Sequence, residues 1–196
     1  MKQQFVSELK KSTWKFSGVA ISSPGSVDTK TGIIYGLSAI EYIHRFEIRK
    51  ELEALFGLRV SIQNDANCAA LAEVWKGNAA EVSNSAFLII GSGVGGAIVL
   101  DKKLFPGPHL FGGEFGFMIL NEKQQTLSEL ASPVTLARNY SLEKGTGESY
   151  DAVHLFDAVQ EDLAQKYVNQ FYRALAIGAF NVLVSIDVER LLIGGG

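Results

Sequence analysis

A glycine-rich segment at residues 91–96 (GSGVGG) lies between two apolar stretches, residues 86–90 and 97–100. Its spacing satisfies G-x-G-x-x-G, but the dinucleotide-binding fingerprint requires a helix after the glycines, and here a strand and a turn follow. The segment also lacks the Gly-Lys-Ser/Thr of a Walker A loop. We therefore predict a β-hairpin whose turn leaves backbone N–H groups and one hydroxyl open to a phosphate. An ordinary tight hairpin is the alternative, although it does not need four glycines.

The apolar patterns along the rest of the chain alternate between strand and helix periods, which places the chain in the α/β class. We predict strands over residues 15–22, 32–36, 59–63, 86–90, 97–100 and 191–193, and helices over residues 46–56, 66–76, 126–138 and 163–184. Residues 1–13 are expected to be the end of a polar helix, and residues 103–116 and 139–149 are expected to be loops. A change of composition at residues 77–85 predicts the boundary between two lobes, residues 1–83 and 84–196.

Two further expectations concern packing. The long helix is expected to bury one face, with a close approach at Gly178, and that face contains Tyr167, Phe171, Ala174, Ile177 and Phe180. Trp14 and Trp75 are expected to pack in a core or between lobes.

Asp65 stands where a predicted strand ends and a predicted helix begins. Aspartate is a preferred helix N-cap, which is one interpretation of this position. The carboxyl ends of strands are also the usual edge for ligand sites in open α/β sheets. There a carboxylate can accept the proton of a hydroxyl that attacks phosphorus, while Asn64 holds the acceptor by hydrogen bonds. Both interpretations stay open, since one residue can fill both roles.

Glu114 is the one carboxylate in the segment 112–116 (GGEFG). It could be a solvated side chain in a turn. The glycines on both sides indicate instead that another part of the chain packs close to this backbone. A carboxylate in such a setting suits recognition of vicinal sugar hydroxyls.

Composition excludes several classes of protein and site. The net charge is −3, without a basic stripe, so we expect no nucleic-acid partner. Cys68 is the only cysteine, which excludes an internal disulfide and any multi-thiolate metal site. The apolar stretches are far shorter than a membrane span of about 20 residues, and residues 1–15 contain no signal-peptide core. We therefore expect a soluble, cytoplasmic protein.

Four segments in order carry a resemblance to a known family: residues 23–25 (SPG), 64–73 (NDANCAALAE), 91–96 (GSGVGG) and 113–116 (GEFG). Together they resemble the ROK family of sugar kinases and sugar-responsive repressors over about residues 18–138. Residues 192–196 (LIGGG) are similar to a later strand-and-glycine motif of that family. The resemblance implies an actin-like ATPase fold of the hexokinase and ribonuclease H-like type, with two lobes. It also implies a homodimer.

The resemblance implies an ATP-dependent kinase that phosphorylates a hexose, a hexosamine or a related glycoside with Mg²⁺. Asp65 would be the catalytic base. The substrate-binding residues would be Gly25, Asn64, Glu114 and Glu129. The second phosphate loop would contain Gly91, Ser92 and Gly93. His44 lies in a region where members of the family contact sugar, and a role at the rim of the site is an alternative to a purely structural one.

Three departures from the family pattern qualify the expectation of activity. The first phosphate loop would lie upstream of Met1, and the adenosine-side elements would follow Gly196, so we expect the chain to be truncated at both ends. Phe117 stands where many members have a histidine, and residues 121–131 contain no cysteine, so we expect no structural zinc. The alternatives to a kinase are the sugar-sensing domain of a ROK-type repressor and an inactive fragment.

Overall fold

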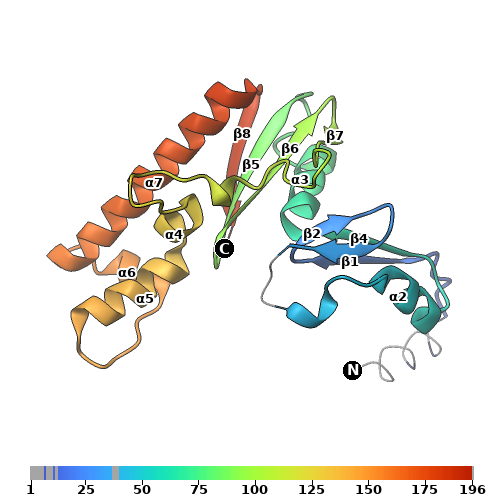
Figure 1. Cartoon of the computed structure of the whole chain (residues 1–196), viewed down its shortest axis with the longest axis horizontal. Coiled ribbons are helices and arrows are strands. Elements are labelled where there is room, and N and C mark those ends of the chain that lie inside the picture. The colour runs from blue at the N-terminus through green and yellow to red at the C-terminus, as the bar shows by residue number, and fades with distance from the viewer. Residues whose placement is uncertain (1–6, 8–10, 12, 37–39, 196) are drawn as a thin grey trace. The chain divides into compact units, whose positions relative to one another are not determined.

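The computed structural model describes residues 7, 11, 13–36 and 40–195 of the chain (Figure 1). The helix expected over residues 1–13 therefore lies almost entirely outside the described residues. The chain forms two compact units, Met1–Cys68 and Ala69–Gly196, and the boundary between them lies within helix α3 (Asp65–Lys76). The two functional lobes, residues 1–83 and 84–196, stay a prediction. Among the described residues, no helix is long and apolar enough to cross a membrane.

The first unit is built on two parallel strands, β1 (Val19–Ser23) and β4 (Val60–Asn64). A small hairpin of β2 (Ser26–Asp28) and β3 (Ile33–Tyr35) follows β1, and a short 3-10 turn, η1 (Glu41–Ile43), comes next. Helix α2 (Ile48–Phe56) ends at Gly57, which adopts the left-handed conformation expected of a glycine stop. The core of this unit contains Val27, Ile34, Val60 and Ile62.

The second unit contains a sheet with the strand order β7-β6-β5-β8. Strands β5 (Ser85–Ile90) and β6 (Val94–Leu100) form an antiparallel hairpin, β8 (Arg190–Gly195) pairs parallel with β5, and β7 (Lys103–Leu104) pairs with β6. Side chains alternate across β5, so Ala86 and Leu88 enter one core and Phe87 enters another. Both faces of this sheet are therefore covered, which explains its continuous apolar sequence.

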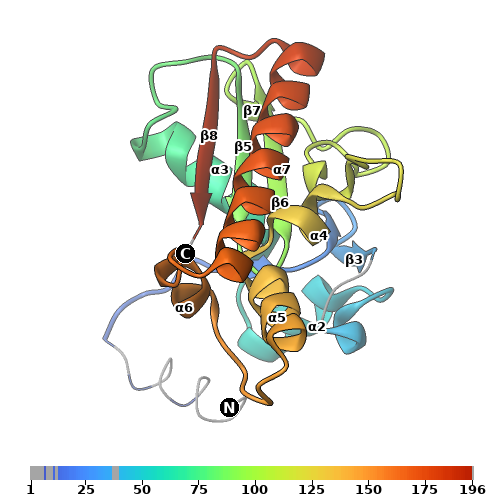
Figure 2. The same cartoon turned by 90° about the vertical axis from the view of Figure 1, so that its left-hand side faces the viewer.

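The first of the two cores lies between the sheet and a set of helices. These are η2 (Phe115–Phe117), α4 (Leu127–Ala131), α5 (Pro133–Lys144), α6 (Ala152–Asp157) and α7 (Asp162–Ile186). Figure 2 shows α7 lying along the sheet. Helix α3 contributes Ala70 to the second core.

The predicted helix over residues 126–138 is two helices. Ser132 ends α4 and caps α5, because its hydroxyl accepts the Thr135 N–H, and Pro133 occupies the first turn. The predicted loop over residues 139–149 is wrong at its start, since α5 continues to Lys144 and stops at Gly145. Helix α6 was not predicted.

The long helix is confirmed, but its predicted buried face is partly wrong. Tyr167, Phe171, Ala174 and Gly178 are buried as expected, and a Cβ on Gly178 would lie 2.8 Å from the Leu127 side chain. Ile177 and Phe180 are exposed, because the buried stripe continues from Gly178 to Val182 in a four-residue step. Trp14 and Trp75 are both exposed, so the expectation of a core position is wrong, and the alternative of a contact between lobes stays a prediction.

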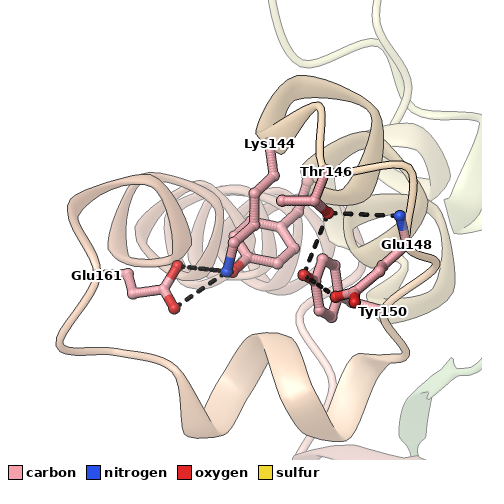
Figure 3. A network of polar contacts seen from close by, with 6 residues as sticks. Lys144, Thr146, Glu148, Tyr150 and Glu161 are labelled. Atoms are coloured by element: carbon pink, nitrogen blue, oxygen red, sulfur yellow. Dashed lines mark hydrogen bonds and ion pairs between the residues drawn. The ribbon is translucent and has the colours of Figure 1, made fainter.

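A polar network joins α5 to the start of α7 (Figure 3). Lys144 Nζ donates to the Tyr140 hydroxyl over 2.7 Å and to Glu161 over 2.8 Å, and the Tyr140 hydroxyl donates to Glu161 over 2.8 Å. The hydrogen bond to Glu161 raises the pKa of Lys144, and the same bond lowers the pKa of Glu161. The network fixes the end of α5 beside Glu161, the N-cap residue of α7.

Candidate functional site

The sequence-predicted residues of the first unit meet at the carboxyl ends of two strands. Ser23 of β1 is in register with Asn64 of β4, so the turn after β1 lies beside the start of α3. Gly25 in that turn has φ +90°, and a Cβ there would lie 2.9 Å from the Ile34 side chain and 3.0 Å from the Tyr35 carbonyl oxygen. Only glycine fits this position without strain.

Asn64 connects the turn after β1 to the start of α3. Its side-chain Nδ2 donates to the Gly25 carbonyl oxygen over 3.1 Å, and its Oδ1 accepts the Asn67 N–H over 3.1 Å. Asn67 is the third residue of α3, so the Asn64 side chain supplies the N-cap interaction. The interpretation that Asp65 supplies this cap is therefore not what the structure shows.

Asp65 is the first residue of α3 and is exposed. Its Oδ1 accepts the N–H of Ala66 over 2.8 Å, and its Oδ2 makes no hydrogen bond with the described residues. The positive end of the helix dipole stabilises a carboxylate at this position. Asp65 thus presents an unbonded carboxylate oxygen to solvent, as a general base requires.

His44 also lies beside Gly25. Its Nδ1 is 2.9 Å from the Gly36 carbonyl oxygen, and its Nε2 is 3.5 Å from the position that a Cβ on Gly25 would take. The imidazole therefore lies directly beside the turn after β1. Both the rim role and the structural role of His44 stay open.

The second unit contains the glycine turn, and the predicted hairpin is confirmed. The turn is closed by a hydrogen bond from the Gly91 N–H to the Gly93 carbonyl oxygen over 2.8 Å. A Cβ on Gly91 would meet no atom within 4 Å, and a Cβ on Gly93 would meet only the Ser128 side chain. Open space therefore lies beside the Gly91 backbone.

Two serines that the sequence analysis did not select hold the turn. The buried Ser132 hydroxyl lies 3.0 Å from the Gly91 carbonyl oxygen and 2.9 Å from that of Ser92. Ser128 Oγ accepts the Val94 N–H over 3.0 Å. The Ser-Pro pair that begins α5 is a helix-start signal that could have identified Ser132.

The Glu114 loop packs against β6, as its glycines predicted. A Cβ on Gly113 would lie 2.7 Å from the Ala97 Cα, and a Cβ on Gly116 would overlap the Val94 carbonyl oxygen. Glu114 is half-buried between these two glycines. Because β6 also begins at the glycine turn, one strand fixes both the turn and the Glu114 loop.

Glu129 is engaged in a capping box. Thr126 donates its N–H to Glu129 Oε2 over 2.7 Å, and the Thr126 hydroxyl accepts the Glu129 N–H over 3.2 Å. The bond from the Thr126 N–H is the main reason that the pKa of Glu129 is lowered. The carboxylate also lines a polar cavity of about 320 Å³ with Arg138 and Lys166.

An apolar cavity of about 360 Å³ lies beside the glycine turn. Its lining includes Ile90, Gly91, Pro133, Val134, Ile193 and Gly194. Apolar side chains and bare glycine backbone suit a flat, uncharged ring. Among the described residues, no group of three or more His, Cys, Asp or Glu side chains could hold a metal ion.

Comparisons with known proteins found a matching family model and several similar proteins. The model of the ROK family matches residues 1–196. The chain is 37% identical to a β-glucoside kinase of Listeria monocytogenes, over 92% of this chain and 64% of that protein. It is 31% identical to an N-acetyl-D-glucosamine kinase of Photobacterium profundum, over 91% of this chain and 64% of that protein.

A solved structure of a ROK family protein from Streptococcus pneumoniae, in complex with sucrose, matches with a TM-score of 0.83 at 34% identity. The match covers 99% of this chain and 68% of that one. The expected actin-like ATPase fold is thereby confirmed. The chain spans 64% of the length of the two kinases.

Proposed function

The chain belongs to the ROK family, and on this premise we propose that the whole protein is an ATP-dependent kinase of a hexose, a hexosamine or a related glycoside. The observation that carries the proposal is Asp65, an exposed carboxylate with one unbonded oxygen at the carboxyl end of β4. Phosphoryl transfer to a sugar needs such a base beside the acceptor hydroxyl.

On the sugar side, Asp65 accepts the hydroxyl proton while the hydroxyl oxygen attacks the terminal phosphorus of ATP. ADP leaves, and the proton passes from Asp65 to solvent. Asn64 retains one N–H and one lone pair beyond its bonds to Gly25 and Asn67, and these orient the sugar. Gly25 leaves room for the sugar because a side chain there is excluded.

On the phosphate side, the turn formed by Gly91, Ser92 and Gly93 binds the phosphates of ATP through backbone N–H groups and the Ser92 hydroxyl. The open space in front of Gly91 supports this role, and the apolar cavity beside it suits the adenine ring. Mg²⁺ carried with ATP neutralises the phosphate charge when bound. We assign no residue of the described chain to that ion.

Glu114 and Glu129 are the proposed sugar-binding carboxylates of the second unit. Glu114 is the stronger candidate, because Gly113 and Gly116 fasten its loop to β6. Glu129 keeps only the acceptor sites that Thr126 does not use. We take residues 1–83 and 84–196 as parts of the two lobes of a zinc-free homodimeric kinase.

The names of the relatives guide the choice of substrates. ADP release from ATP by the full-length protein, with glucose, N-acetylhexosamines and β-glucosides as acceptors, tests the proposal. We expect turnover with at least one of them. A folded protein that binds sugar without releasing ADP would contradict the kinase and favour the sugar-sensing alternative.

A further inference from the structure

Two phenylalanines in the Glu114 loop are exposed and lie against each other. The side chain of Phe111 is 69% exposed and that of Phe117 is 59% exposed. Their ring centroids are 6.5 Å apart, with planes inclined by 49°. Two large aromatic side chains held together in solvent are a typical feature of a binding surface.

The backbone places these rings on either side of Glu114. The Glu114 N–H donates to the Phe111 carbonyl oxygen over 3.1 Å, and the Phe117 N–H donates to the Glu114 carbonyl oxygen over 3.2 Å. These are two consecutive turns: the first contains Gly113 at φ +91°, and the second is the 3-10 turn η2. The two rings and the carboxylate therefore belong to one short, hydrogen-bonded segment.

The core does not require these rings. Phe115, between Glu114 and Phe117, is the aromatic that enters the core, and it is 8% exposed. The same segment is fastened to β6 at Gly113 and Gly116. The backbone that carries the exposed rings is thus packed against β6, and little backbone entropy is lost when a ligand binds to them.

We propose that Phe111 and Phe117 bind the aglycone of a β-glucoside whose sugar ring is bound by Glu114. The inference rests on the proposed function, in which Glu114 binds ring hydroxyls. A carboxylate suits hydroxyls, and an adjacent aromatic pair suits a flat apolar group attached to the same sugar. The similarity to a β-glucoside kinase agrees with an acceptor that carries such a group.

The experiment compares phenyl β-glucoside with methyl β-glucoside, which present the same sugar with and without an aromatic aglycone. The full-length protein is assayed as wild type and as the variants Phe111→Ala, Phe117→Ala and Phe117→Leu. The matched control is Phe180→Ala, since Phe180 is a 65% exposed phenylalanine on α7. The readout is the ratio of kcat/KM for the phenyl and methyl glucosides.

We expect each alanine variant to lower this ratio about 3- to 10-fold, and Phe117→Leu to lower it by a similar factor, because the aromatic face is lost. Phe180→Ala leaves the ratio unchanged. Turnover of both glucosides with an unchanged ratio in the Phe111 and Phe117 variants would overturn this inference alone. If that result came with a change of oligomeric state on size exclusion, the platform would be a protein contact instead. Turnover of glucose or an N-acetylhexosamine by the wild-type protein without turnover of either glucoside would also overturn this inference alone. Absence of turnover with every acceptor would overturn the proposed function and this inference with it.

Discussion

Asn64 Nδ2 donates a hydrogen bond to the carbonyl oxygen of Gly25 over 3.1 Å. The bond joins the turn after β1 to the start of α3, two segments that are distant in sequence and meet because β1 and β4 are parallel and in register. It fixes the backbone of Gly25 relative to the residue that precedes Asp65. The bond therefore ties together two sides of the proposed sugar site.

The first prediction concerns the base. Asp65→Asn keeps the size of the side chain and removes its basicity, so we expect kcat to fall about 10²- to 10⁴-fold. Sugar affinity, measured by calorimetry, should change less than about twofold, because the substitution adds no bulk. Activity of the variant equal to that of the wild type would rule out Asp65 as the base.

The second prediction separates the two bonds of Asn64. Asn64→Ala removes both the bond to Gly25 and the N-cap bond to Asn67, and should lower the free energy of unfolding by about 1–3 kcal/mol. Asn64→Asp keeps the acceptor for the Asn67 N–H and loses only the donor, so its loss should be smaller. Urea denaturation of the full-length protein measures both. Equal losses of unfolding free energy in Asn64→Ala and Asn64→Asp would show that the bond to Gly25 accounts for the whole effect.

The third prediction contrasts two glycines. Gly91→Ala should leave the unfolding free energy nearly unchanged, since no atom lies within 4 Å of the new Cβ, but should raise KM for ATP. Gly116→Ala places a methyl group on the Val94 carbonyl oxygen and should destabilise the protein by about 1–3 kcal/mol. Thermal melts and ATP titrations distinguish the two effects. An unchanged KM in Gly91→Ala would argue against phosphate binding at this turn.

The fourth prediction concerns Ser132, whose hydroxyl lies against the carbonyl oxygens of Gly91 and Ser92. Ser132→Ala removes the hydroxyl that bonds both carbonyl oxygens and the Thr135 N–H, and should cost about 1–3 kcal/mol of stability, with a higher KM for ATP. Ser141→Ala is the matched control, because the Ser141 hydroxyl donates within α5, to Ala137, away from the turn. The Ser141→Ala variant should be less stable than wild type and should keep the wild-type KM for ATP. A raised KM in both variants would mean that general loosening of α5 is the cause.

The fifth prediction is a pH dependence of stability. The hydrogen bond from Lys144 lowers the pKa of Glu161 below its ordinary value of 4.5, so the folded state binds this proton less readily than the unfolded chain. The interaction therefore stabilises the protein above that ordinary value, and its contribution is lost as the pH falls through the lowered pKa. Wild type should exceed Glu161→Gln in unfolding free energy at neutral pH, and the difference should shrink below about pH 5. If the difference in unfolding free energy between wild type and Glu161→Gln did not depend on pH, the lowered pKa of Glu161 would be contradicted.

Local sequence determined most of the elements. The glycine hairpin, the helix that begins at Asp65 and the helix stop at Gly57 are local features, because dihedral freedom and capping act over a few residues. The local pattern was insufficient for contacts between segments that are distant in sequence. Ser132 and Pro133 divide the helix over residues 126–138 by a local signal, but the contact of the Ser132 hydroxyl with the glycine turn depends on the fold.

The site shows the same division. The sequence by itself determined which residue types stand at the strand ends and in the glycine loops, and these carry the proposed chemistry. Only the tertiary structure decided that Asn64 bonds to Gly25, that Asp65 keeps an unbonded oxygen and that Phe111 and Phe117 lie together in solvent. The physical reason is that hydrogen-bond partners and exposure depend on segments brought together by strand register and packing, which periodicity along one chain does not specify.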